Sequence, residues 1–312
     1  MTLARALQLA ERGRGTTRPN PVVGAVVVRD GEVVGEGWHK RKGGPHGEVV
    51  ALQAAGERAR GATLYTTMEP CTHHGNTPPC TRAILEAGVA RVVAGAVDPN
   101  PKAAGGLEEL SAAGVDVELI DSFEARAQNE AWRTWVAQGR PFVTYKAAMT
   151  LDGRLTLPGE RWISGEESRR LVHELRAASD AVAVGMGTVT ADDPKLTARE
   201  VGAAKQPRRL AFGRGPLPEG SDLELRSGRL ADELAALASE GVQSLLLEGG
   251  PTLAAAFFRG DLVDKLLVFA APKVSGEGPT LFQDRVPPRP LTRLQPRPVG
   301  EDVLLSAYVH EP

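Results

Sequence analysis

Cysteine and aromatic residues are scarce in this chain of 312 residues, which contains two cysteines and 4% Phe, Trp and Tyr. A chain of this length buries roughly three quarters of the surface that it exposes when unfolded. It therefore needs neither a disulfide nor a metal merely to fold, and its length predicts two domains. Both cysteines nevertheless lie within one short turn-rich segment, and their placement calls for an explanation.

Long apolar runs and an excess of one charge are missing as well. No stretch approaches the roughly 18 consecutive apolar residues that indicate a membrane span. The amphipathic start MTLARALQLAERGRG lacks the apolar core and cleavage site of a secretory signal, so we expect a cytoplasmic protein without a membrane partner. The net charge is −2, whereas nucleic-acid-binding domains usually show a basic face, so no nucleic-acid partner is expected.

The remaining composition is that of an ordinary globular protein, with 42% hydrophobic and 24% charged residues. The segment Val22–Trp38 predicts a hairpin with Asp30-Gly31 as its turn. Apolar residues recur at helical spacing in His46–Arg60, and Thr63–Pro70 predicts a strand that ends in a loop. Alternation of this kind predicts an α/β sandwich, with helices packed on a largely parallel sheet.

A second alternating series follows a break in the pattern. We expect one long helix over Ser122–Gln138, after which Gly139–Pro141 interrupts the periodicity. The new series begins with FVTYKAAMTLDGR and ends in VLLSAYVH. We therefore predict two domains, residues 1–140 and 141–312, each of the α/β class.

The segment MEPCTHHGNTPPC holds both cysteines, Cys71 and Cys80. Two cysteines in such a protein can be core residues, a redox pair or metal ligands. Each follows a proline, and Cys80 opens a predicted helix, where the positive end of the helix dipole favours a thiolate. Upstream, PHGEVVAL brings His46 and Glu48 to the start of another predicted helix.

Two thiolates and one imidazole fill three corners of the tetrahedron that zinc prefers and leave the fourth for water. In a protein site zinc can lower the pKa of its bound water to about 7, compared with about 9 for the aqueous zinc ion. A carboxylate two residues after the ligand histidine can take the proton of that water and deliver it to a departing amine, as in the H-x-E…P-C-x-x-C deaminases. Here eight residues rather than two separate the cysteines.

The segments NPVVGAVVV, HGEVVAL and MEPCTHHGNTPPC occur in this order and closely resemble the deaminase domain of the bifunctional deaminase/reductases of riboflavin biosynthesis. The longer loop between the cysteines is characteristic of that family. The resemblance covers roughly residues 1–145 and implies a cytidine-deaminase-like α/β/α zinc domain. It also implies that His46, Cys71 and Cys80 bind one Zn²⁺ and that Glu48 is the catalytic proton shuttle.

Three further residues of this half are substrate candidates. The resemblance implies that Asn20 contacts the pyrimidine ring, although a turn residue before a proline is the alternative. Asp98 and Asn100 in AVDPNP also match a family segment, but Asp and Asn form turns after strands without any functional reason.

The other histidines receive no catalytic role. His73 and His74 are interpreted as loop residues that can touch substrate, because a fourth protein ligand would close the metal site to water. We expect His39 at the solvated end of the hairpin and His173 on an exposed helix face. His310, near the C-terminus, has no assigned function.

The second half is less informative by itself. It has no G-x-G-x-x-G after a strand, so the ordinary dinucleotide-binding fingerprint is absent. LLLEGGPTLAAAF predicts a strand, two glycines and a helix with proline at its start. Backbone N–H groups at such a helix N-terminus can bind a phosphate, although the same pattern is often only a tight connection.

The segments KAAMTLDGR, RWIS, LRAASDAVAVGMGTVTADDPKLTAR and LLLEGGPTL resemble the reductase domain of the same family over roughly residues 141–310. That resemblance implies a dihydrofolate-reductase-like α/β fold that uses NADPH. Implied cofactor contacts are Trp162, Thr188, Asp192, Gly250, Pro251, Thr252, Leu253, Ala254, Ala255 and Ala256. Implied substrate contacts are Lys146, Arg176, Leu196, Arg199 and Glu248.

Several alternatives remain at this level. Arginine forks suit a sugar phosphate, but ordinary surface ion pairing is the alternative for each of them. Asp152 in LDG is a further candidate, for which a mere turn former is the alternative. Residues 208–236 match the family too poorly for contacts to be assigned.

The resemblance implies two consecutive reactions on phosphoribosylaminopyrimidines. The first is hydrolytic deamination of 2,5-diamino-6-(5-phosphoribosylamino)pyrimidin-4(3H)-one. The second is NADPH-dependent reduction of 5-amino-6-(5-phosphoribosylamino)uracil to the ribitylamino product. It also implies a homo-oligomer, a dimer or a tetramer. Alternatives are a single-activity pyrimidine deaminase with a non-catalytic second domain, a deaminase of another nucleobase, and a binding protein whose structural zinc takes His73 or His74 as fourth ligand.

Overall fold

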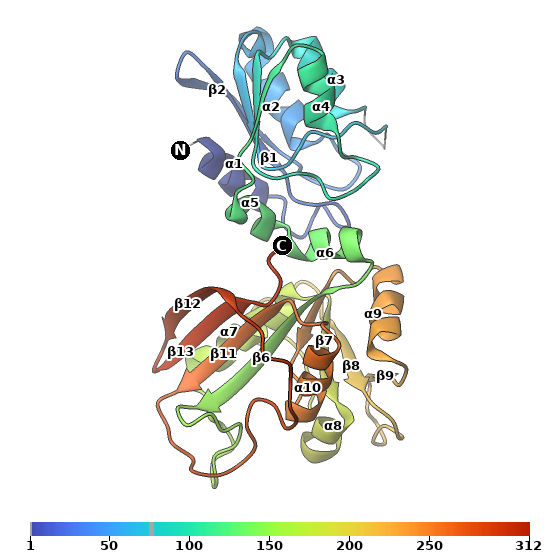
Figure 1. Cartoon of the computed structure of the whole chain (residues 1–312), viewed down its shortest axis with the longest axis vertical. Helices are drawn as coiled ribbons and strands as arrows, with labels where there is room; N and C mark the ends of the chain where they lie inside the picture. The colour runs from blue at the N-terminus through green and yellow to red at the C-terminus, as the bar shows by residue number, and fades with distance from the viewer. Residues whose placement is uncertain (1, 75–77) are drawn as a thin grey trace. The chain divides into compact units, whose positions relative to one another are not determined.

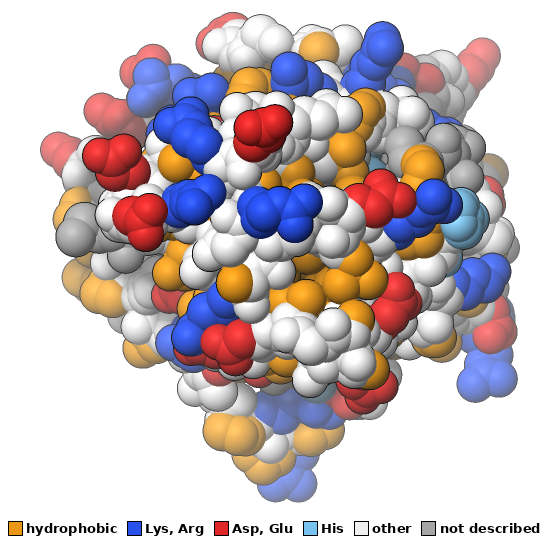
Figure 2. Space-filling view, turned by 90° about the horizontal axis from the view of Figure 1, so that it is seen from above, with side chains coloured by type: hydrophobic (Ala, Val, Ile, Leu, Met, Phe, Trp, Pro, Cys, Tyr) orange, Lys and Arg blue, Asp and Glu red, His pale blue; other side chains and the backbone are white. Residues whose placement is uncertain are grey.

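The computed structural model describes residues 2–74 and 78–312 (Figure 1). The chain divides into two compact units, Met1–Gln138 and Gly139–Glu311. No helix within the described ranges is both long enough and apolar enough to cross a membrane. On the face drawn in Figure 2, basic and acidic side chains are interspersed, with apolar side chains visible between them.

The first unit contains a mixed sheet with the strand order β2-β1-β3-β4-β5. Its strands are β1 (Gly24–Arg29), β2 (Glu32–Trp38), β3 (Thr63–Thr66), β4 (Arg91–Ala94) and β5 (Asp116–Leu119). Strand β1 pairs antiparallel with β2 and β3, whereas β3, β4 and β5 run parallel. The predicted hairpin is confirmed, and both turn residues, Asp30 and Gly31, have positive φ angles of 51° and 82°. Because a two-residue turn can join only antiparallel strands, the hairpin makes this sheet mixed rather than largely parallel.

Helices cover both faces of this sheet (Figure 1). They are α1 (Thr2–Glu11), α2 (Gly47–Ala55), the 3₁₀ turn η1 (Gly56–Ala59), α3 (Cys80–Ala87), α4 (Gly106–Ala112), α5 (Phe123–Gln128) and α6 (Glu130–Gln138). Side chains alternate across β1, so Ala25 and Val27 join the core with Leu52 of α2, while Val26 packs with Leu9 of α1 on the other face. The first unit is therefore an α/β/α sandwich.

The single long helix expected over Ser122–Gln138 is wrong, because the chain breaks at Asn129 between α5 and α6. The buried Asn129 side chain accepts from the Val22 N–H at 2.9 Å and donates to the Val22 carbonyl at 2.9 Å. This pair of bonds anchors the segment that leads into β1, and it requires Asn129 to leave the helical conformation.

The second unit contains a sheet with the order β12-β13-β11-β6-β10-β7-β8-β9. Its strands are β6 (Phe142–Thr150), β7 (Ala181–Gly185), β8 (Arg208–Phe212), β9 (Glu224–Arg226), β10 (Ser244–Leu247), β11 (Lys265–Ala271), β12 (Thr292–Val299) and β13 (Asp302–Tyr308). The six strands from β11 to β9 in this order run parallel to one another, and β13 and β12 add an antiparallel edge.

Helices α7 (Glu166–Ala178), α8 (Met186–Asp192), α9 (Leu230–Ser239) and α10 (Pro251–Arg259) accompany this sheet. The weakly matching region 208–236 forms β8, β9 and part of α9, where Arg208 and Arg226 both pair with Glu224 and Glu240. The carboxyl ends of β6, β7, β10 and β11 meet at one edge, which is where ligands bind in open α/β sheets.

Candidate functional site

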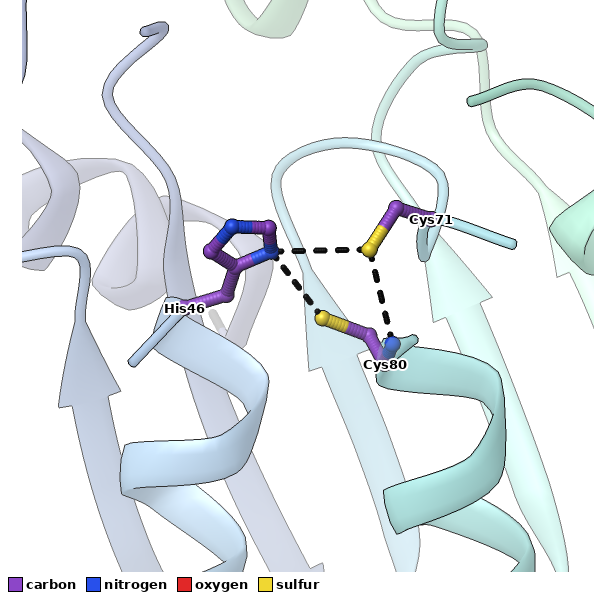
Figure 3. A group of neighbouring side chains, drawn as sticks. All are labelled: His46, Cys71 and Cys80. Carbon is purple, nitrogen blue, oxygen red and sulfur yellow. Dashed lines mark hydrogen bonds between the residues drawn. The ribbon is translucent and has the colours of Figure 1, made fainter. Parts of the chain in front are cut away.

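Three potential metal ligands converge at the ends of two helices in the first unit. His46 is the residue before α2, Cys80 is the first residue of α3, and Cys71 lies in the loop after β3 (Figure 3). His46 Nδ1 lies 3.2 Å from Cys80 Sγ and 3.5 Å from Cys71 Sγ, and all three ligand atoms lie within 4.8 Å of one another. Adjacent corners of a zinc tetrahedron with ordinary Zn–N and Zn–S bonds are about 3.5 Å apart, so the spacing fits this ion.

The two cysteine thiols have different proton affinities. Cys80 directs its thiol at Cys71 and donates its backbone N–H to Cys71 Sγ at 3.4 Å, and these bonds together with His46 hold the pKa of Cys71 well below its usual range. The same interaction and burial raise the pKa of Cys80. Metal binding needs both thiolates, so loading this site must release the proton that the pair retains.

Glu48 lies beside these ligands in the first turn of α2. Its side chain is buried, at 3% exposure for the residue, and Oε2 has no hydrogen-bond partner among the residues that the structure describes. Burial raises the pKa of Glu48 to about 7, against the opposing charge of His46. A buried carboxylate oxygen without a partner is costly, so its retention beside three metal-ligating atoms indicates a role in proton transfer.

His73 and His74 are exposed, and neither belongs to the cluster formed by the described residues. The cluster thus provides three protein ligands and leaves one tetrahedral position for water or substrate. That arrangement is typical of catalytic rather than structural zinc.

Glu69, which sequence reasoning missed, organises the loop that carries two substrate candidates. Its buried carboxylate accepts the backbone N–H groups of Asp98 and Leu107 at 3.1 and 3.2 Å, together with that of Gly105 at 3.1 Å. Asp98 Oδ1 accepts the Asn100 N–H at 2.8 Å, so Asp98 supports a turn. The sequence did hold one signal for Glu69, namely an acidic residue placed between an apolar strand and a cysteine in MEPC.

Asn100 continues the same turn, because its Oδ1 accepts the Lys102 N–H at 3.1 Å. The side chains of Asp98 and Asn100 therefore have structural bonds, whatever contacts they make with a ligand. Burial raises the pKa of Asp98 to about 6, and the nearby Glu69 charge adds to the effect.

The expectation that His39 is solvated is wrong. His39 is buried, at 2% exposure. It directly follows β2, and its backbone N–H continues the pairing by donating to the Val23 carbonyl at 2.8 Å. Its ring packs edge-on against the ring of His46, with centroids 5.2 Å apart, and its Nε2 lies 3.4 Å from Nδ2 of Asn20. Antiparallel pairing in the hairpin thus brings a substrate candidate and a metal ligand to the same histidine.

Gly106 allows the loop of Cys71 to pass close to α4. A Cβ atom at this position would lie 1.8 Å from the Pro70 carbonyl oxygen, so Gly106→Ala must displace the backbone that precedes Cys71. We expect the zinc affinity of Gly106→Ala to fall about 10–100-fold, as for other changes just outside a metal's ligands. Competition with a chelating dye measures the zinc affinity. Gly187→Ala is the matched control, because an added Cβ atom at that position would have no neighbouring atom within 4 Å. Unchanged affinity in Gly106→Ala would contradict the expectation.

In the second unit, three predicted residues form a buried charge cluster. Glu248 follows β10 and accepts two bonds from Arg176 of α7, at 2.6 Å from Nε and 2.9 Å from Nη2. Lys146 of β6 places Nζ 3.8 Å from Glu248 Oε2. The side chains of Arg176 and Glu248 are only 15% and 9% exposed, so this is not ordinary surface pairing.

The charges of this cluster depend on one another. Burial opposes ionisation of Glu248, but the bonds from Arg176 and the charge of Lys146 hold the pKa of Glu248 below its usual value. Burial lowers the pKa of Lys146. Two cations share one carboxylate, so the cluster has an excess of positive charge that suits a phosphate or a developing alkoxide.

Leu196 and Arg199 flank a loop beside this cluster. Leu196 is buried in the core, whereas Arg199 is exposed. The Thr197 carbonyl accepts from Arg176 Nη1 at 3.2 Å, and the Arg199 N–H lies 3.2 Å from His173 Nδ1. His173 is half-buried and contacts this loop, so its predicted place on an exposed helix face is wrong.

The predicted cofactor residues lie mainly at the starts of α8 and α10. Pro251 is the first residue of α10, and a Cβ atom on Gly250 would meet Thr188 Oγ1 of α8 at 3.5 Å. Trp162 is 51% exposed, and Asp192 ends α8. The other predicted cofactor residues divide by burial, with Thr252 exposed, Leu253 and Ala256 half-buried, and Ala254 and Ala255 fully buried.

The environment of the α10 residues limits what they can offer a ligand. The Ala254 N–H is bonded to the Gly250 carbonyl within the helix, and the Ala254 side chain lies in the core. The Leu253 side chain lies within 3.4 Å of a Cβ atom built on Gly185, so it packs between the two helix starts. Pro251 has no N–H, so the backbone N–H groups of Thr252 and Leu253 are the ones that the helix itself leaves without a partner at the start of α10.

Asp152 is more than a turn former. It accepts from Thr150 Oγ1 at 2.6 Å and from the N–H groups of Ser275 and Gly276 at 3.0 and 2.8 Å. These bonds lower the pKa of Asp152 to about 2 and join the loops that follow β6 and β11.

Known families match both units. The cytidine and deoxycytidylate deaminase zinc-binding region matches residues 1–96, and the RibD C-terminal domain matches residues 141–305. The riboflavin biosynthesis protein RibD of Aquifex aeolicus is 43% identical over 308 residues, covering 88% of this chain and 86% of that protein. The chain belongs to the RibD family.

RibD of Escherichia coli is 42% identical and covers 88% of each chain. The structure is similar to that of Acinetobacter baumannii RibD, with a TM-score of 0.85, 34% identity and coverage of 98% and 97%. It is also similar to a diaminohydroxyphosphoribosylaminopyrimidine deaminase/5-amino-6-(5-phosphoribosylamino)uracil reductase of Thermotoga maritima, with a TM-score of 0.82, 34% identity and the same coverage. The predicted family, fold class and pair of activities are confirmed: this RibD-family chain is a bifunctional riboflavin-pathway enzyme, both hydrolase and oxidoreductase.

Proposed function

We propose that residues 1–140 deaminate 2,5-diamino-6-(5-phosphoribosylamino)pyrimidin-4(3H)-one and that residues 141–312 reduce the resulting uracil derivative with NADPH. The observation that carries the first step is the unpartnered Oε2 of Glu48 beside the clustered ligand atoms of His46, Cys71 and Cys80. These three residues would hold one zinc ion. When bound, zinc lowers the pKa of a coordinated water and so supplies the nucleophile.

Glu48 moves the proton that hydrolysis requires. Replacing the ring amine by oxygen consumes one water and releases one ammonia, so a proton must travel from the nucleophile to the leaving nitrogen. A carboxyl group with a pKa near 7 can accept and return a proton at neutral pH. Glu48 Oε2, which has no partner among the described residues, is the atom assigned to both transfers. Asn20, and more weakly Asp98 and Asn100, are assigned to binding of the pyrimidine.

The reduction is assigned to the charge cluster of Lys146, Arg176 and Glu248. NADPH, when bound, would supply a hydride to C1 of the sugar in its ring-opened imine form, and the nitrogen of the resulting amine needs a proton. Lys146 is the candidate donor, because burial lowers its pKa. Arg176 and Arg199, beside the buried Leu196, are assigned to the sugar phosphate. Arg199 is exposed, and its guanidinium fork matches phosphate oxygens, whereas Arg176 uses its fork on Glu248 and contributes positive charge.

The cofactor is assigned to the starts of α8 and α10, with Trp162, Thr188, Asp192 and the segment Gly250–Ala256. The start of α10 has no side-chain cap, and the N–H groups of Thr252 and Leu253 have no partner within the helix, which supports phosphate binding there. We also propose that the protein is cytoplasmic and forms a homo-oligomer, either a dimer or a tetramer. Its small-molecule substrates are phosphoribosylaminopyrimidines.

A coupled assay tests the two-step proposal. Zinc-loaded protein receives the diamino substrate and NADPH, and ammonia release and NADPH absorbance are followed separately. We expect both signals, with NADPH loss following ammonia release. Ammonia without NADPH loss, even when deaminated intermediate is supplied, would favour a single-activity deaminase. Absence of ammonia from zinc-loaded protein would overturn the deaminase assignment.

A further inference from the structure

His39 has a hydrogen-bond partner for each ring nitrogen, although it is neither a metal ligand nor an assigned substrate residue. Nδ1 lies 3.0 Å from the Pro45 carbonyl oxygen, and Nε2 lies 3.4 Å from Nδ2 of Asn20. Pro45 immediately precedes His46, so these contacts connect the metal-binding segment with Asn20. At 2% exposure, His39 has no solvent to replace either partner.

The identity of the Pro45 partner decides the tautomer of His39. A carbonyl oxygen can only accept a hydrogen bond, so Nδ1 must carry a proton and donate it. In the neutral ring Nε2 is then an acceptor. Of the two ends of the Asn20 amide, the N–H₂ group is the one that can donate to it. The amide oxygen of Asn20 cannot take that place, because two acceptors would face each other.

The backbone of Asn20 is held independently of its side chain. The Asn20 N–H donates to the Thr17 carbonyl at 3.0 Å, and Thr17 Oγ1 donates to the Asn20 carbonyl at 3.1 Å. Thr17 is buried at 1% exposure. The backbone bonds leave the side-chain torsions of Asn20 free, and the bond to His39 Nε2 constrains the direction of its amide.

We propose that His39 is a positioning residue of the deaminase site, which turns the amide oxygen of Asn20 toward the substrate. Asn20 then accepts a hydrogen bond from a ring N–H or an amino group, so the site selects ligands that present a donor at this position. This inference rests on the proposed deaminase function and on the assignment of Asn20 to the pyrimidine. It adds a specificity determinant that acts through Asn20.

A double-mutant cycle tests the proposal. His39→Phe keeps a ring in the buried position but removes both nitrogens. We expect the KM for the diamino substrate to rise about three- to tenfold, as for loss of one hydrogen bond, with kcat and zinc content little changed. In an Asn20→Ala background the same replacement should add no further rise. Equal effects in both backgrounds, or loss of zinc in His39→Phe, would overturn the proposal.

A second measurement needs neither a variant nor turnover. Nitrogen NMR of wild-type, zinc-loaded protein with labelled histidine reports which ring nitrogen of His39 carries the proton. The proposal requires the Nδ1–H tautomer, and an Nε2–H ring would overturn it. Should the wild type release no ammonia, the proposed function fails by itself, while the tautomer still tests the orientation of Asn20.

Discussion

Glu48→Gln should lower the rate of ammonia release by about 10²–10⁴-fold, the usual loss when a positioned general acid–base group is removed. Glutamine has the same size and fits the same buried place, but it cannot carry the proton between nucleophile and leaving amine. Zinc content should stay at the wild-type level, because Glu48 is not among the three clustered ligands. NADPH oxidation with supplied deaminated intermediate should also be unchanged.

The matched control for this variant is Glu57→Gln, an exposed position on η1 of the same unit. It changes the same charge without touching the metal site, so ammonia release should match that of the wild type. Elemental analysis of zinc separates a catalytic loss from a metal loss. A Glu48→Gln protein that retains zinc and releases ammonia within twofold of the wild-type rate would remove Glu48 from the mechanism.

Glu248→Gln should destabilise the second unit by about 3–5 kcal/mol, the range measured when one partner of a buried ion pair is removed. The change leaves Arg176 and Lys146 in a poorly solvated place without their carboxylate. Urea unfolding followed by hydrogen exchange of β6 and β10 peptides measures the loss. A change below about 1 kcal/mol, the usual limit for a solvated pair, would show that the cluster is solvated or adaptable.

Two controls sharpen this test. Glu174→Gln removes an exposed carboxylate, 4.0 Å from Arg170, and should change stability by no more than about 0.5 kcal/mol. Glu248→Gln combined with Arg176→Met should recover part of the loss, because it removes one of the unpaired cations.

Acid should weaken the same cluster. The folded-state pKa of Glu248 lies below its ordinary value of 4.5, so the unfolded chain binds more protons than the folded chain in that window. The contribution of Glu248 is present above pH 4.5 and is lost as the pH falls through the folded-state pKa. The difference between wild type and Glu248→Gln should therefore shrink on acidification.

Local features of the sequence predicted local structure well. Asp30-Gly31 marks the turn of the hairpin because both residues tolerate positive φ, and Pro251 opens α10 because a first helical residue needs no N–H donor. Both of these predictions depend on neighbours close in the chain, whereas the zinc-dependent deaminase assignment rested on the resemblance of three ordered segments to a known family.

Tertiary structure decided which distant residues meet. His46 and Cys80 are 34 positions apart, and Arg176 and Glu248 are 72 apart, yet each pair is in contact because strand order brings the element ends together. The burial of His39 and the break at Asn129 also depend on long-range partners, namely Asn20 and Val22. The sequence by itself determined the chemical groups and the local turns. Only the packed sheets determined their mutual distances, burial and proton affinities, since these depend on contacts that sequence spacing does not encode.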